Sequence, residues 1–310
     1  MRDRIRDALQ FLDVNDREVW IRAGMAIKDE LGEEGFDLWD QWSQDGKTYK
    51  VSAALSSWRS FKGAGVSVGS LFHEALANGW RPAADGEQRK VTPEQLRERQ
   101  RERDERLTAE GIARAQAQDA AARKAQWILS QCKAEQHAYL HSKGWPDATG
   151  SVWWPTEESN LLCIPMRADG ALVGVQMIDR TGSKHYLKGQ RTSGAEYVIS
   201  NDGRGAVDWW VEGYATGLSL RDCLHALRLR YRIHVCFSAG NLKRMAATGC
   251  VVADRDDSLT GEKAAQATGL PYFLPPAGDF NDMHRSMGTF RASQTLRKWL
   301  AEARREVAVA

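Results

Sequence analysis

Apolar residues recur every three or four positions through residues 1–80, the spacing that places side chains on one face of a helix. The successive stripes are Ile5, Leu9 and Leu12; Trp20, Gly24, Ile27 and Leu31; Phe36, Trp39 and Trp42; Val51, Leu55 and Trp58; and Val68, Leu71 and Ala75. This pattern predicts an all-helical domain at residues 1–80. Because the aromatic residues keep the helical spacing, we expect them to pack in its core rather than to stack on bases.

Two local signals mark helix ends in this domain. Asn15 and Glu18 have the spacing of a capping box, which predicts a helix that begins after Asn15. Asn78 and Gly79 are typical of a helix that has just ended.

Residues 81–130 differ from the segments on either side. Residues 81–92 are polar, contain Pro82 and Gly86 and have no periodicity, which is typical of a linker. A helix is predicted from Pro93, because Thr92 can cap it and proline suits its first position. Residues 97–106 alternate arginine with acidic residues, and we expect a solvated helix with ion pairs along it rather than a DNA-binding arm.

Short apolar runs predict a small β-rich subdomain at residues 131–205. Strands are expected at 161–166, 171–178 and 184–187, since Asp-Gly and Thr-Gly pairs between them are typical of hairpin turns. The preceding segment, 127–144, carries Cys132, His137 and His141 with both histidines expected on one helical face. That spacing would suit zinc, but no fourth ligand is evident, so a zinc site is not expected.

Strand and helix alternate through residues 206–310, which predicts an α/β domain with a parallel sheet. The expected strands are 207–211, 233–237, 251–253 and 272–274, and the expected helices are 217–227, 242–247 and 261–268. An amphipathic helix at 289–307, with Phe290, Leu296, Trp299 and Leu300 as its apolar positions, closes the domain.

Acidic residues follow two of these strands. Glu212 ends the first, and Asp254 and Asp256 end the third, with side chains that can point the same way in an extended chain. Ligands of open α/β sheets bind at the carboxyl ends of the strands, so we expect these carboxylates to lie together. Their mutual repulsion and their oxygen donors predict a site for Mg²⁺ or Mn²⁺, and Asp279 and Asp282 form a further acidic group after the last strand.

Composition limits the classes of protein to consider. The chain has 310 residues, 42% of them hydrophobic and 27% charged, as in soluble globular proteins of more than one domain. With a net charge of +2, any nucleic-acid site must be a local patch. No signal peptide, membrane-spanning run or P-loop is found, and five well-separated cysteines favour the cytoplasm over a disulfide-forming compartment.

The acidic positions occur within longer motifs that resemble a known domain. EGYAT at 212–216 opens a helix, SAGNL at 238–242 follows the second strand, and GDFND at 278–282 follows the fourth. With the Asp-x-Asp at 254–256, this series resembles the Toprim domain of phage and plasmid primases, over roughly residues 130–290. The resemblance implies a Rossmann-like parallel sheet, so the expected fold class is α+β and multidomain.

The same resemblance implies roles for individual residues. Glu212, Asp254 and Asp256 would be catalytic and, with Asp279 and Asp282, would hold metal. Glu212 would be a metal ligand or the general base. The segment KHYLKG at 184–189 resembles the basic patch of primases, so Lys184 and Lys188 would bind nucleotide or DNA, together with Asn241 and Lys243. In the register that primases often use for the last metal contact, this chain has Asp279 and Asn281.

The helical domain carries a second resemblance. WIRAGMA at 20–26, GFDLW at 35–39, WRSFK at 58–62 and GSLF at 69–72 resemble the primase C-terminal helical module of phage and plasmid replication proteins. Here the module precedes the polymerase-like part, and no zinc-binding domain or motor is evident. The expected function is a magnesium-dependent DNA primase that acts on single-stranded DNA with nucleoside triphosphates, with a helicase supplied in trans. A Toprim nuclease and a non-catalytic replication accessory protein are the alternatives.

Overall fold

A computed structural model describes residues 1–61, 66–82, 93–201, 203–255 and 259–309. The chain divides into two compact units, Met1–Arg114 and Ala115–Ala310. Helices alone form the first unit, and the second combines helices with two five-stranded sheets. The mixed α+β class and the N-terminal helical region are therefore confirmed. No helix among the described residues combines the length and the apolar character needed to cross a membrane.

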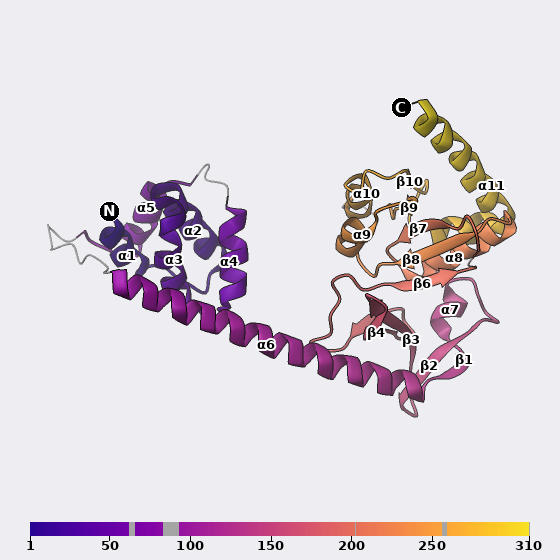
Figure 1. Ribbon diagram of the computed structural model, residues 1–310, viewed down its shortest axis with the longest axis horizontal. Coiled ribbons are helices and arrows are strands. Elements are labelled where there is room, and N and C mark those ends of the chain that lie inside the picture. Colours follow the sequence, from indigo (N-terminus) through magenta and orange to yellow (C-terminus); the bar gives the residue numbers. More distant parts are fainter. Residues whose placement is uncertain (62–65, 83–92, 202, 256–258, 310) are drawn as a thin grey trace. The chain divides into compact units, whose positions relative to one another are not determined.

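Five helices and one short 3-10 helix surround an aromatic core in the first unit (Figure 1). They are α1 (Arg2–Leu9), α2 (Arg17–Leu31), η1 (Gly32–Gly35), α3 (Phe36–Ser43), α4 (Val51–Ser60) and α5 (Val68–Ala77). Trp39 is fully buried, with its ring centroid 4.4 Å from that of Trp20, 5.6 Å from Trp58 and 5.4 Å from Phe61. The prediction that these aromatic residues form the core is confirmed.

Glycine at position 24 lets α2 approach this core closely. A Cβ atom at Gly24 would lie 2.5 Å from the Phe61 ring and 2.8 Å from the Trp39 ring. Any larger residue would therefore separate α2 from two of the central aromatic rings.

One predicted helix end is confirmed and the other is wrong by one residue. Helix α5 ends at Ala77, and Gly79 adopts a positive φ of 97°, as its type suggested. The cap of α2 is Asp16, whose carboxylate accepts the N–H groups of Glu18 and Val19. Asn15 instead accepts the N–H of Lys47, so it connects the start of α2 to the loop between α3 and α4 and does not cap the helix.

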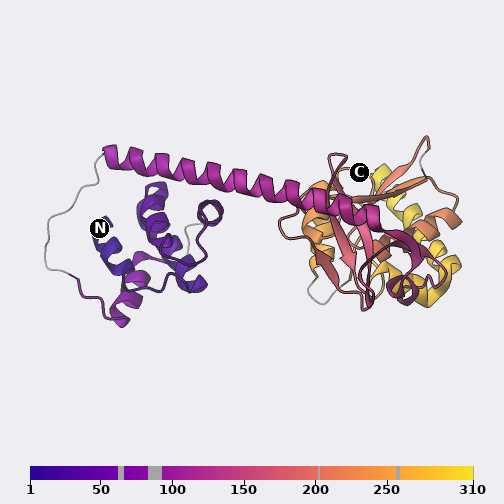
Figure 2. The same cartoon turned by 90° about the horizontal axis from the view of Figure 1, so that it is seen from below.

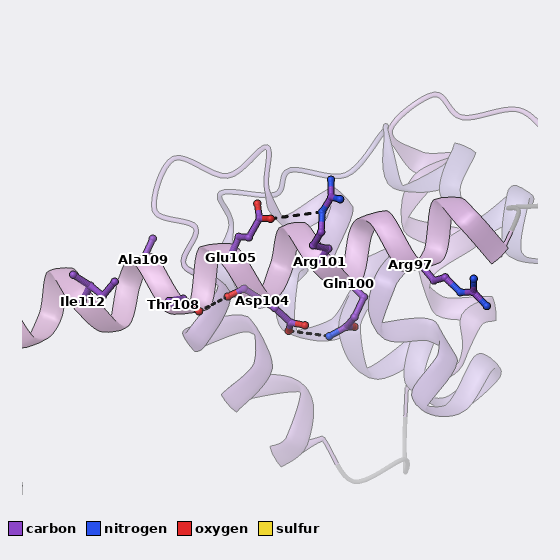
Figure 3. A pocket seen from close by; sticks show the side chains of 8 residues that line it. All are labelled: Arg97, Gln100, Arg101, Asp104, Glu105, Thr108, Ala109 and Ile112. Atoms are coloured by element: carbon purple, nitrogen blue, oxygen red, sulfur yellow. Dashed lines mark hydrogen bonds and ion pairs between the residues drawn. The ribbon is translucent and has the colours of Figure 1, made fainter.

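The long helix α6 (Pro93–Gln131) begins where it was predicted. The sequence predicted a solvated helix over residues 97–106. In the structure one face of this part of α6 contacts α3 instead. Arg103 is buried and makes ion pairs with Asp37 and Asp40. Other side chains of α6 are exposed, and some of them line a shallow hollow (Figure 3). There Arg101 pairs with Glu105, one turn further along the helix.

Further along, α6 also caps α4. The Glu110 carboxylate accepts the N–H groups of Val51 and Ser52 and the Ser52 hydroxyl. Desolvation opposes ionisation of Glu110, but these hydrogen bonds outweigh it and hold its pKa below the usual value.

The first sheet of the second unit is antiparallel, in the order β1-β2-β3-β4-β5. Its strands are β1 (Lys133–Gln136), β2 (Thr149–Thr156), β3 (Ser159–Ala168), β4 (Ala171–Ile178) and β5 (Lys184–Tyr186). The last part of α6 lies across it (Figure 2), with Ala125 and Ile128 packed on Cys163, Val175 and Met177. The predicted strands near 161–166, 171–178 and 184–187 are confirmed, whereas β1 and β2 were not predicted.

The segment with the proposed zinc spacing differs from the prediction. Cys132 follows the last residue of α6, and β1 separates it from the short helix α7 (Ala138–Ser142). His137 is the residue before α7, and its Nδ1 accepts the N–H of Tyr139. The two histidines therefore do not share a helical face, and His137 has a capping role.

The second sheet has the order β10-β9-β7-β8-β6. Strands β7 (Val207–Val211), β8 (Tyr231–Val235), β9 (Cys250–Val252) and β10 (Tyr272–Phe273) are parallel, and β6 (Tyr197–Ser200) is an antiparallel edge strand that was not predicted. Helices α8 (Tyr214–Ala226) and α11 (Phe280–Val309) cover one face, and α9 (Ala239–Met245) and α10 (Thr260–Gln266) cover the other (Figure 1).

Helix α11 is longer than the predicted 289–307 and is interrupted at Gly288, which has φ 75° and ψ 159°. Leu296 is fully buried, and Trp299 and Leu300 pack on the same core. Phe290 is 76% exposed, so its assignment to the apolar face was wrong.

Candidate active site at the carboxyl end of the second sheet

Glu212 directly follows β7, a central strand of the second sheet. The parallel register pairs Val211 with Val252 of β9 on one side and with Val235 of β8 on the other. Immediately beyond, the N–H of Phe237 donates to the carbonyl of Glu212 at 2.9 Å. These contacts place Glu212 at the carboxyl end of the sheet, the edge where open α/β sheets bind ligands.

Asp254 reaches the same edge from β9. The N–H of Ala253 donates to the carbonyl of Phe273 at 3.0 Å, which continues the pairing of β9 with β10. Arg255 and Gly278 then form an antiparallel bridge, with the Arg255 N–H 2.9 Å from the Gly278 carbonyl. One step along that register, Asp254 is opposite Asp279. Asp256, the other half of the predicted Asp-x-Asp, lies outside the described residues.

Asp279 and Asp282 form a reciprocal cap at the start of α11. Oδ1 of Asp279 accepts the N–H of Asp282 at 2.8 Å, and Oδ2 of Asp282 accepts the N–H of Asp279 at 3.4 Å. Gly278, before them, has a φ of 63°, and a Cβ there would lie 2.6 Å from Oδ2 of Asp282. The predicted acidic group after the last strand therefore has a local structural function, and a metal-binding role would be additional.

Asn281, two residues after Asp279, forms hydrogen bonds inside the second unit. It is fully buried, and its Nδ2 donates to the carbonyl of Lys143 at 2.9 Å and to the Ser219 hydroxyl at 3.0 Å. The Ser219 hydroxyl also contacts Nδ1 of His284 at 3.0 Å. Asn281 thus joins α11 to α8 and to the turn after α7 through its Nδ2.

The carboxylates at this edge are hard oxygen donors, the type that Mg²⁺ and Mn²⁺ prefer. Within the described ranges, however, no three His, Cys, Asp or Glu side chains converge closely enough to hold a metal ion. The donor chemistry of Glu212, Asp254 and Asp279 fits such an ion, and Asp256 is the sequence-predicted ligand that the described residues do not include.

The predicted basic residues occupy two places. Lys184 lies on β5, the exposed edge strand of the first sheet, and Lys188 is exposed in the segment that follows. Lys243 is exposed on α9, which begins near the carboxyl end of β8. Only Lys243 is thus carried by a helix that starts at the edge where Glu212 lies.

Asn241 has a different position from the one expected of a ligand-binding residue. It is buried, its Nδ2 contacts the carbonyls of Thr192, Ala195 and Cys236, and its Oδ1 accepts the N–H of Gly194. Both atoms of its amide are engaged within the protein, so we assign it a structural role.

Two arginines near Asn241 were not among the predicted site residues. Arg191 donates to the Ser193 carbonyl at 3.0 Å, and Arg244 donates to the Ser193 hydroxyl. The signal available in the sequence was the basic, glycine-containing run at 188–194, which continues beyond the KHYLKG segment.

The comparison with protein families gives one match in the first unit. Residues 5–75 match the family Primase C terminal 2 (PriCT-2), and the match covers α1 to α5 almost completely. This confirms the expected resemblance of the helical module.

A solved structure also shows a similarity. It contains a bacteriophage T7 lagging-strand DNA polymerase interacting with primase domains of two gp4 subunits bound to an RNA/DNA hybrid and dTTP. The aligned part is 14% identical and covers 49% of this chain and 82% of that chain, with a TM-score of 0.36. At that score the likeness bears on neither fold nor function. The family match therefore carries the conclusion that this chain has a primase-associated helical module, similar to PriCT-2, in its first unit.

Proposed function

We propose that this chain is a DNA primase of a phage, plasmid or other mobile element, which makes short RNA primers on single-stranded DNA. The observation that carries this proposal is the PriCT-2 match of residues 5–75, in a chain whose second unit has acidic residues directly after two parallel strands. A replication module beside a carboxylate edge suits nucleotidyl transfer, because that reaction needs divalent cations and a positioned strand end.

The Toprim character of the second unit belongs to the same proposal. Glutamate follows β7, the first parallel strand along the chain, and Asp254 follows β9, its direct neighbour in the sheet. The register through Arg255 and Gly278 adds Asp279 from the turn after β10. This order of acids on adjacent strand ends supports the resemblance to the Toprim domain.

In the proposed reaction, Mg²⁺ bound at the edge would supply positive charge that offsets the charge of the phosphates. Asp254 and Asp256 would hold the ion, with Asp279 as a further oxygen donor. Glu212 would accept the proton of the 3′-hydroxyl that attacks the incoming nucleotide. Its backbone is fixed by hydrogen bonding to the end of β8, so its side chain starts from a defined position.

A synthesis assay tests this proposal directly. The full chain is incubated with a single-stranded template, labelled nucleoside triphosphates and Mg²⁺, and the products are separated by size. Asp254→Asn with Asp256→Asn is expected to abolish synthesis. The matched control, Asp119→Asn with Asp147→Asn, removes equal charge from exposed positions of the same unit and should retain it.

The products also distinguish the alternatives. Short labelled RNA that depends on Mg²⁺ and on Asp254 supports a primase. Shortened template without new RNA would instead identify a Toprim nuclease. Template binding with neither product would indicate an accessory protein.

A further inference from the structure

The segment 188–195, between β5 and β6, is held in place by two side-chain amides. At its start, Oε1 of Gln190 accepts the N–H groups of Val175 and Leu187, both at 3.2 Å. Gly174 makes this possible, because a Cβ there would lie 2.6 Å from Oε1 of Gln190. The first anchor therefore ties the segment to β4.

Asn241 of α9 provides the second anchor. Its Nδ2 donates to the Thr192 carbonyl at 2.6 Å and to the Cys236 carbonyl at 3.1 Å, and its Oδ1 accepts the Gly194 N–H at 3.1 Å. Asn241 is only 6% exposed, so these hydrogen bonds form away from water. A buried donor or acceptor without a hydrogen bond costs free energy, so this contact is strongly favoured. The segment is thus fixed from both ends before any ligand arrives.

Cationic side chains surround this fixed segment. Lys188 and Arg191 belong to it, and Lys243 and Arg244 extend from α9 beside it. Arg191 and Arg244 both contact Ser193, one through its carbonyl and the other through its hydroxyl. Arg191 also pairs with Asp169 at 3.1 Å, but that carboxylate is 84% exposed and its pairing is weak in water. Two further carboxylates lie nearby, since Glu196 follows the segment and pairs with His234, and Glu212 lies near Cys236. The four cationic side chains therefore form a local basic group next to the carboxylate edge.

The segment lies close to the carboxylate edge. Cys236, whose carbonyl Asn241 binds, is the residue directly after β8. The next residue, Phe237, donates its N–H to the carbonyl of Glu212. The basic segment is therefore connected through Asn241 and residues 236–237 to Glu212, the residue proposed as general base.

We propose that residues 188–195 and α9 form a preformed phosphate-binding bracket, in which Arg191 and Arg244 contact phosphate oxygens and Asn241 is a positioning residue. Guanidinium groups suit this role because their planar donors match two phosphate oxygens at once. A fixed segment loses little conformational freedom when an anion binds. The inference rests on the proposed function only for the source of the phosphate, which is a nucleotide or a nucleic-acid strand.

Binding of two probes, measured on the full chain without Mg²⁺ and with EDTA, tests the bracket. One probe is a labelled single-stranded oligodeoxythymidylate, followed by anisotropy at several salt concentrations. The other is inorganic triphosphate, followed by calorimetry. Arg191→Ala with Arg244→Ala is compared with Arg297→Ala with Lys298→Ala, which removes the same charge from exposed positions on α11.

We expect the Arg191 and Arg244 double variant to bind at least one probe about tenfold or more weakly than the control variant. If the probe is the oligonucleotide, the slope of log affinity against log salt should fall by about 1.4, for two lost phosphate contacts on a single strand. Loss confined to the oligonucleotide identifies a strand, and loss confined to triphosphate identifies a nucleotide. Equal binding by the two double variants for both probes overturns the proposal.

Asn241→Ala tests the positioning role, because it keeps both arginines. We expect Asn241→Ala to weaken binding of the same probe and to reduce the same salt dependence. Combining it with the arginine replacements should cause no further loss of affinity. A lower thermal midpoint with unchanged affinity and slope would show that Asn241 has only a structural role. If the variant does not fold, the arginine comparison still decides whether the bracket exists.

These measurements are independent of primer synthesis. A chain that binds phosphate through the bracket but makes no RNA would contradict the proposed function and leave the bracket supported. A chain that makes primers with unchanged binding in the arginine variant would contradict the bracket alone.

Discussion

Replacing Arg103 by alanine should strongly destabilise the helical unit, although the residue lies in a helix that the sequence predicts to be solvated. Its side chain is 9% exposed and pairs with Asp37 and with Asp40, whose side chain is only 2% exposed. The guanidinium also lies over the Phe36 ring, 4.7 Å from its centroid. The variant would leave Asp40 buried without this countercharge.

The expected loss follows from that burial. Removing one partner of a buried ion pair costs about 3–5 kcal/mol, because the remaining charge keeps its desolvation penalty. The matched control is Arg101→Ala in the same helix. Arg101 is 72% exposed and faces Glu105 at 3.6 Å, so its loss should cost roughly 0.3–0.5 kcal/mol.

The urea midpoint of the helical unit can be measured separately in the full chain, by monitoring unfolding through hydrogen exchange in peptides from residues 17–60. With a denaturant slope of about 2 kcal/mol/M, Arg103→Ala should lower the urea midpoint by about 1.5–2.5 M. Arg101→Ala should lower it by about 0.25 M or less. Equal midpoints for the two variants would refute the conclusion that α6 is part of the folded helical unit.

Three further perturbations test other parts of the chain. Asp254→Asn with Asp256→Asn should remove Mg²⁺-dependent activity and leave the thermal midpoint unchanged or raised, since repulsion between carboxylates is relieved; a large fall in the midpoint would assign them a structural role. Burial lowers the pKa of His137 from 6.5, and its neutral ring caps α7, so stability is fully present above pH 6.5 and falls as the unfolded chain takes up protons below it. His137→Asn keeps a capping group that does not titrate, so its unfolding free energy should fall less between pH 7.5 and pH 5.5 than that of the parent. Gly249→Ala should cost about 2 kcal/mol or more, seen as a midpoint lower by about 4–8 °C, because φ is 87° and the new Cβ would lie 2.0 Å from the Asp208 carbonyl oxygen.

Strands with a strong apolar pattern were predictable, and strands formed by pairing alone were not. Strands β4 and β7 have the predicted bounds, because each is an apolar run between turn residues. By contrast, β1 (Lys133–Gln136) has the sequence KAEQ, and its residues are mostly exposed. It is a strand because it pairs with β2, in a register that sets Lys133 opposite Val152. Pairing of that kind leaves no signal in the strand's own sequence.

The same distinction applies to the candidate site. The positions of Glu212 and Asp254 at strand ends followed from chain order, because parallel strands bring their carboxyl ends to one edge. The roles of Asn241 and Asn281 did not, since their partners are remote in sequence. Asn281 binds the carbonyl of Lys143, 138 residues away, and Asn241 binds Thr192, 49 residues away. An amide at a turn predicts a hydrogen bond but not its partner.

Backbone strain occurs at two positions near the carboxyl edge, where the active site is proposed. Phe237 and Leu259 have positive φ values of 65° and 56°, a conformation that costs a non-glycine residue energy. Phe237 follows β8 and donates to the Glu212 carbonyl, and Leu259 precedes α10, on the connection that begins with Asp254. Glycine has a positive φ at both edges, at Gly205 and Gly249 on the opposite edge and at Gly278 beside Asp279, and Arg228 on the opposite edge is another non-glycine residue with a positive φ. Because glycine would adopt these conformations at lower cost, the larger residues at Phe237 and Leu259 are consistent with the proposal that the carboxyl edge binds a ligand.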